Sequence, residues 1–120
     1  INRARREIGG FFERYDALIT PSTAVVSPEH GLYGLNLEGF HPVDYIAYGD
    51  RPVQFSFPFN VAGAPAISLP LAMHSNGLPI GVQVAGRPAE DHVVIALAAA
   101  LEEAMPWHDR VPPLHVSNVI

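Results

Sequence analysis

The most constraining feature of the sequence is a run of alternating side chains that follows an Asn-Gly dipeptide. Every second residue from Ile80 to Val84 is a branched apolar one, which is the two-residue period of a half-buried β-strand. Segment 74–77 ends in Asn-Gly and supplies the positive-φ residues of a tight reversal. Segment 66–69 is typical of another strand, which we expect to end at Pro70. The pattern predicts an antiparallel hairpin.

A helix is predicted over residues 88–104. Pro88 suits the first turn of a helix, and Glu90 and Asp91 favour the positive end of its dipole. Pro106 ends the pattern. The apolar stripe of this helix consists of Val93, Val94, Leu97, Ala98 and Leu101.

Shorter elements are predicted before the hairpin. Residues 2–15 have apolar side chains at helical spacing, and residues 17–19 are typical of a buried strand that Pro21 stops. Segment 61–64 is predicted to form one helical turn, and Asn60 is placed to cap its N-terminus.

Between these elements, residues 22–54 follow no helical or strand period and are rich in Gly, Pro and aromatic side chains. A structureless segment of this length is unusual within a compact domain and is typical of a binding loop or lid. Its aromatic content is too high for a solvated linker. We expect it to pack over a substrate cleft or over further polypeptide.

Composition excludes several classes of function. The 120 residues allow one small domain, and the net charge of −5 argues against a nucleic-acid or anionic-membrane partner. All seven basic residues are arginine, so no lysine base is present. Cysteine is also absent, which excludes disulfides, thiolate zinc sites and cysteine nucleophiles. The longest apolar run, 93–101, is too short to span a bilayer.

The N-terminus indicates a piece of a longer chain, because Ile1 stands where a translated chain has Met and no signal-peptide core follows. A processed mature chain is the alternative. Charged residues make up only 16% of the sequence, which leaves little material to solvate a free-standing surface. We therefore expect part of the apolar surface to face other polypeptide, and a cytoplasmic location.

Histidine and serine residues give no local catalytic pattern. None of the six histidines has a partner at the spacing of two metal ligands on one helix or strand face, so no metal site is predicted. None of the serines lies in a nucleophile-elbow motif. Ser68 lies within an apolar strand, where a hydroxyl bonded to backbone is the ordinary outcome.

Two polar residues within apolar surroundings are more informative. Gln83 has apolar neighbours on both sides, so its amide either joins two backbone segments or faces a cleft. Asn60 has the same two interpretations, beside its capping role. The sequence alone does not decide between them.

The ordered set of residues in the second half resembles the C-terminal part of the amidase signature family. Tyr15 to Thr23 looks like the helix exit and strand that precede it, and Pro106-Trp107 with Pro112 resembles the usual C-terminal end. The resemblance is weak only through residues 24–53. The matching positions are Asn60, Gly63, Pro65, Ala66, Ser68, Pro70, Gly77, Leu78, Pro79, Gly81 and Gln83.

This resemblance implies an α/β fold, with a mixed sheet layered between helices, and hydrolysis of a carboxylic amide through a serine acyl-enzyme. The family uses a serine nucleophile, a second serine and a lysine base, without metal or cofactor. These groups belong to the family's N-terminal part, and no catalytic residue can be carried onto this chain. Segment 1–120 is therefore expected to be inactive alone and to need that N-terminal part as its partner.

What the segment can supply is scaffold and substrate-cleft wall, with residues 22–54 lying over the cleft. Val53 stands where the tRNA-dependent transamidating members have an acidic residue, which favours a less polar small-molecule amide. The alternative is a non-catalytic binding module with the same architecture. Assembly of the protein into a homo-oligomer is a further alternative. The expected cleft residues are Ser22, Phe55, Phe57, Asn60 and Gln83.

Overall fold

The computed structural model describes residues 1–31, 41, 43 and 52–116. Most of the segment 22–54, expected to lie over the cleft, falls outside the described residues. Its described beginning, up to Gly31, forms no helix or strand, but residues 52 and 53 are helical. The elements are α1 (Asn2–Phe11), β1 (Ala17–Pro21), α3 (Phe57–Ala62), β2 (Ala66–Met73), β3 (Pro79–Gly86) and α4 (Asp91–Ala104).

The predicted hairpin is present as β2 and β3, which pair antiparallel. Its turn is closed by the Gly77 amide, which donates to the His74 carbonyl at 2.9 Å, and Gly77 has a φ of 84° that favours glycine. The expectation that β2 ends at Pro70 is wrong. A register shift between Leu69 and Ala72 accommodates the proline, because an irregular step removes the need for its missing N–H.

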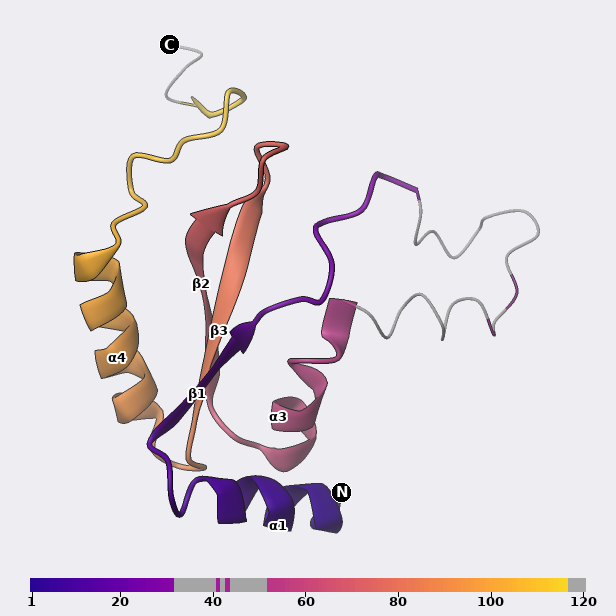
Figure 1. The fold of residues 1–120 in the computed structure, drawn as a ribbon, viewed down its shortest axis with the longest axis vertical. Helices are drawn as coiled ribbons and strands as arrows, with labels where there is room; N and C mark the ends of the chain where they lie inside the picture. The colour runs from indigo at the N-terminus through magenta and orange to yellow at the C-terminus, as the bar shows by residue number, and fades with distance from the viewer. Residues whose placement is uncertain (32–40, 42, 44–51, 117–120) are drawn as a thin grey trace.

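β3 is the central strand of the sheet, with β1 on one side and β2 on the other. β1 also pairs antiparallel with β3, and it extends two residues beyond the predicted strand, to Pro21. All three described strands are thus antiparallel to their neighbours, so any parallel pairs of a mixed sheet lie outside the part that the structure describes. In Figure 1 the hairpin runs upright and β1 crosses it obliquely.

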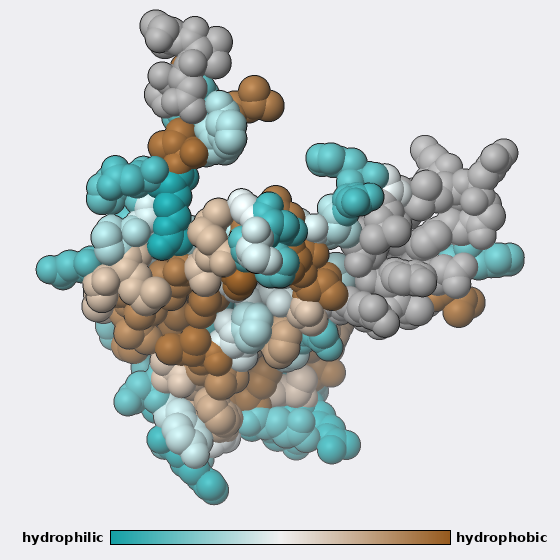
Figure 2. All heavy atoms as spheres, turned by 45° about the horizontal axis from the view of Figure 1, so that its top comes forward, coloured by the Kyte–Doolittle hydropathy of each residue, from teal (hydrophilic) through white to brown (hydrophobic). Residues whose placement is uncertain are grey.

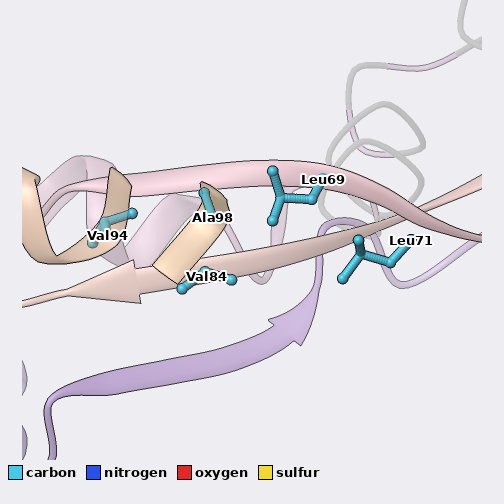
Figure 3. Close-up of a cluster of buried hydrophobic side chains, with 5 residues drawn as sticks. All are labelled: Leu69, Leu71, Val84, Val94 and Ala98. Atoms are coloured by element: carbon cyan, nitrogen blue, oxygen red, sulfur yellow. The ribbon is translucent and has the colours of Figure 1, made fainter. Parts of the chain in front are cut away.

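α4 covers one face of the sheet. Its buried residues Val94 and Ala98 pack against Leu69, Leu71 and Val84 (Figure 3). The helix begins at Asp91 and not at Pro88 as predicted, because Ala89 adopts a left-handed φ of 65°. A left-handed residue cannot continue a right-handed helix, so Pro88 belongs to the connection after β3.

α1 and α3 cover part of the opposite face, so the sheet lies between helices (Figure 1). Phe12 and Phe59 pack there against Ala85 of β3. α1 ends at Phe11, four residues before the predicted end at Tyr15. Phe12 is fully buried, and its carbonyl accepts hydrogen bonds from the Arg87 guanidinium. This long-range contact fixes the chain where the helical pattern would have continued.

α3 begins earlier than predicted, at Phe57, with Ser56 at its N-cap. Asn60 therefore lies inside the helix and not at its N-cap, which corrects the expected capping role. Pro58 explains the earlier start, because proline is favoured in a first helical turn. Gly63 ends α3 with a left-handed φ of 70°, and its amide donates to the Phe59 carbonyl at 2.8 Å.

Candidate functional site

A row of polar side chains crosses the face of the sheet that α1 and α3 cover only in part. Thr20 of β1 and Ser68 of β2 are both register partners of Gln83 on β3. Directly paired residues of neighbouring strands present their side chains to the same face. With Ser22, which follows β1, these residues form what we term the hydroxyl–amide row: Thr20, Ser22, Ser68 and Gln83.

Gln83 is the buried centre of this row, with 5% of its surface exposed. Its amide nitrogen donates to Thr20 Oγ1 at 3.2 Å and to the Phe55 carbonyl at 3.0 Å. These two bonds account for both amide hydrogens. The interpretation of Gln83 as an amide that joins separate segments is therefore confirmed: it ties β1 to the segment before α3.

Ser22 and Ser68 meet above Gly81. Their hydroxyl oxygens lie 2.5 Å apart and share a hydrogen bond, and the Ser22 amide donates to the Gly81 carbonyl at 2.9 Å. A Cβ atom at position 81 would lie 2.7 Å from Ser22 Oγ and 2.9 Å from Ser68 Oγ. The absence of a side chain at Gly81 is thus what allows hydroxyls from the two outer strands to meet.

Ser68 belongs to this row although the local sequence pattern assigned its hydroxyl to backbone, and that expectation is wrong. The signal was present in three places: a serine within an apolar strand, a glycine within the strongest strand pattern, and a glutamine two residues later. Combining them requires the register of β2 on β3, which local sequence patterns do not provide.

The remaining expected cleft residues lie around the start of α3. Phe55 is half-buried and joined to the hydroxyl–amide row through its carbonyl. Phe57 is 60% exposed, and Asn60 is also exposed on α3. The structure thus brings Ser22, Gln83 and Phe55 into one connected region and leaves Phe57 and Asn60 on the outer surface of the helix.

A pocket of about 330 Å³ lies beside this region. We term it the α1–α3 pocket. The polar residues among those that line it are Thr20, Gln54 and Glu7. Its apolar lining comes from Ile8, Phe11, Leu18, Phe55, Pro58 and Phe59, together with Phe12.

Among the described residues, no base contacts the hydroxyl groups of the row. In the part of the chain that the structure describes, the hydroxyls of Ser22 and Ser68 bond to each other and to no other side chain. Lysine is absent from the whole sequence. A serine hydroxyl becomes a nucleophile only beside a proton acceptor. The arrangement can bind and position a polar group, but it lacks the parts for covalent catalysis.

Metal-binding and membrane-spanning features are absent from residues 1–31, 41, 43 and 52–116. Within these ranges no three His, Cys, Asp or Glu residues converge as a metal site would require. No helix in the same ranges is both long and apolar enough to cross a membrane.

Comparison with known proteins gives one consistent family. The family model described as Amidase matches residues 1–95. The 6-aminohexanoate-cyclic-dimer hydrolase of Pseudomonas sp. (strain NK87) is 42% identical over 104 residues, which is 83% of this chain and 21% of that protein. The amidase AmiC of Mycobacterium tuberculosis, named as putative, is 39% identical over 96% of this chain and 23% of its own length.

Solved structures agree with the sequence comparisons. A structure of 6-aminohexanoate cyclic dimer hydrolase superposes with a TM-score of 0.73 at 37% identity, covering 86% of this chain and 23% of that one. A bacterial aryl acylamidase of the amidase signature family gives a TM-score of 0.63 at 28% identity, covering 88% of this chain and 21% of that one.

The chain spans about a fifth of the length of the curated relatives it matches. Its elements nevertheless follow theirs closely enough to confirm the expected α/β fold of amidase signature enzymes. The resemblance noted in the sequence is thereby confirmed over most of the chain. This protein belongs to the amidase family.

Proposed function

We propose that this chain forms the scaffold and part of the substrate-cleft wall of an enzyme that hydrolyses a carboxylic amide to an acid and an amine or ammonia. The observation that carries the proposal is the match of residues 1–95 to the amidase family in a chain that contains no lysine. A Ser-Ser-Lys centre therefore needs at least its lysine from outside this chain. The nucleophile, a serine, would form the acyl-enzyme there.

The wall would be formed by Ser22, Phe55, Phe57 and Asn60, with Gln83 beneath them. Gln83 donates both amide hydrogens, to Thr20 and to Phe55. It would therefore contribute to substrate binding indirectly, by holding the Phe55 segment in place. The exposed face of Phe57 and the half-buried Phe55 are suited to an apolar substrate group. The transamidating members of the family have an acidic residue at the position of Val53, where it would hold a charged amine. The apolar side chain of Val53 therefore supports the same preference for an apolar substrate group.

The partner of this chain in the proposal is the N-terminal part of an amidase, and the ligand is a small-molecule amide. The relatives whose names state an activity include hydrolases of a 6-aminohexanoate cyclic dimer, which are amide-cleaving enzymes acting on a small molecule. A cytoplasmic location and a homo-oligomeric state stay predictions from the sequence.

Complementation tests this function. The 6-aminohexanoate-cyclic-dimer hydrolase would be produced without the segment that aligns with this chain, and the missing part would be supplied in trans. We expect hydrolysis of the cyclic dimer to return with this chain, as it should with the hydrolase's own segment, which serves as the positive control.

The proposal is contradicted if the hydrolase's own segment restores turnover and this chain, shown to be folded by circular dichroism, restores none. That outcome would favour the alternative, a binding module that has kept the architecture without serving an amidase. Binding of this chain to the truncated hydrolase, measured separately, distinguishes failed docking from a docked but unproductive wall.

A further inference from the structure

The α1–α3 pocket has the size and lining of a small-molecule site. Its volume of about 330 Å³ falls at the lower end of the range of about 300–1,000 Å³ seen for ligand pockets. An engineered apolar cavity of about 150 Å³ holds one benzene molecule. The pocket can therefore hold one ring with a few further carbon atoms, or a short aliphatic chain.

One buried side chain joins two of the residues that line the pocket. Thr20 lies on β1 and Phe55 precedes α3, and both line the pocket. Gln83 donates to Thr20 Oγ1 and to the Phe55 carbonyl from a position that is 5% exposed. This cross-link holds β1 and the segment before α3 together before a ligand arrives, and such preorganisation lowers the cost of binding.

The charges around the pocket disfavour an anionic ligand. Among the residues that the structure describes, Glu7 is the one charged residue that lines it, and its carboxylate already pairs with Arg3 at 2.8 Å. A ligand carboxylate would lose its hydration against phenylalanine and leucine side chains without a cation in return. The apolar end of a neutral amide has no charge to dehydrate, so its burial in the pocket carries no such cost.

We propose that the α1–α3 pocket binds the apolar part of an uncharged amide, a short aliphatic chain or an aryl ring, and that Gln83 is the positioning residue that holds Phe55 beside Thr20 in its wall. This inference rests on the proposed function for the choice of an amide as ligand. The Thr20 hydroxyl already donates to the Pro21 carbonyl and accepts from Gln83, so Gln54 is the neutral lining residue that would meet the polar end of such a molecule.

Direct binding to the 120-residue chain tests the inference without catalysis. Benzamide and hexanamide would be titrated and followed by amide chemical shifts, with benzoate and acetamide as the charged and the small comparison. We expect shifts centred on Leu18 and Phe55, and affinity about tenfold weaker for benzoate and acetamide, which corresponds to roughly 1.4 kcal/mol.

Phe55→Ala should weaken benzamide binding about tenfold, because it removes one ring from the pocket wall. Ile95→Ala is the control, because Ile95 is exposed on α4 and does not line the pocket. It should bind benzamide like the unaltered chain. The dispersion of the amide signals reports whether each variant is folded.

Equal affinities for benzamide and benzoate in the unaltered chain would overturn the inference, whatever the variants do. So would the absence of binding in a folded chain, which would assign the pocket to a polypeptide contact. Neither result bears on the complementation experiment, because that experiment measures turnover. Restored hydrolysis together with an empty pocket would leave the proposed function intact and refute the pocket's role.

Discussion

Gly81 determines whether the hydroxyl–amide row can exist. Changing Gly81 to Ala places a methyl group within 3 Å of the Ser22 and Ser68 oxygens, so the two serine side chains must move and their close hydrogen bond is disturbed. We expect the free energy of unfolding to fall by about 1–3 kcal/mol, the usual range for an overpacked site. Urea denaturation followed by circular dichroism measures this.

Gly10→Ala is the matched control for that substitution. Gly10 lies within α1, and a Cβ atom there meets nothing within 4 Å, so alanine should stabilise the chain by up to about 1 kcal/mol through its helix propensity. If Gly81→Ala proved as stable as the unaltered chain, the close meeting of the two hydroxyls would be refuted.

Gln83 should be sensitive to loss of its two hydrogen-bond donors. Gln83→Met keeps a similar length but leaves the Phe55 carbonyl and Thr20 without their partner, which should cost about 1–3 kcal/mol. Gln54→Met provides the comparison at an exposed position, where a change within about 0.5 kcal/mol is expected. Similar midpoints in urea for the two variants would argue against a joining role for Gln83.

Among the elements, α4 offers adjacent positions with opposite environments. Val94 is 3% exposed against the sheet, whereas Ile95 is 63% exposed. Val94→Ala should lower stability by about 2 kcal/mol through the cavity that it leaves, and Ile95→Ala should change it by less than about 0.5 kcal/mol. Thermal unfolding of both variants tests which face of α4 meets the sheet, and a larger loss for Ile95→Ala would contradict the packing in Figure 3.

The elements that local patterns encode were predictable from the sequence. The hairpin follows from an Asn-Gly turn and a two-residue period, and α4 follows from its apolar stripe. Two of the boundaries that were missed depend on contacts distant in sequence. Arg87 ends α1 from 75 residues away, and β2 continues past Pro70 because β3 tolerates a register shift there.

The candidate site was predictable only in part, for the same reason. A glutamine in an apolar strand indicates a buried amide. Its partners Thr20 and Phe55 are known only once the strands and the segment before α3 are in place. Ser68 escapes prediction because no local rule pairs it with Ser22. The contribution of residues 32–40, 42 and 44–51 to the cleft stays a prediction.

At the scale of the whole molecule, large apolar side chains remain uncovered in the isolated chain. Ile19 on the sheet is 57% exposed and Phe57 on α3 is 60% exposed. Figure 2 shows hydrophobic residues gathered over the middle of one face, with hydrophilic residues around its edge. Apolar surface of this extent is typical of an interaction site.

We therefore expect the isolated chain to self-associate as its concentration rises. Light scattering coupled to size-exclusion chromatography measures this, and the truncated amidase of the complementation experiment should compete with self-association. A monodisperse monomer at all concentrations, with a cooperative thermal transition, would show that these side chains need no partner.

The central claim is that this chain belongs to an amidase and carries none of its nucleophilic centre. The most direct measurement is the rate of ammonia or amine release from short aliphatic and aryl amides by the purified 120-residue chain. We expect no release above the uncatalysed rate, because no lysine is present and no base contacts the Ser22–Ser68 pair among the residues that the structure describes. Turnover that follows the chain through purification and disappears in Ser22→Ala or Ser68→Ala would contradict the claim.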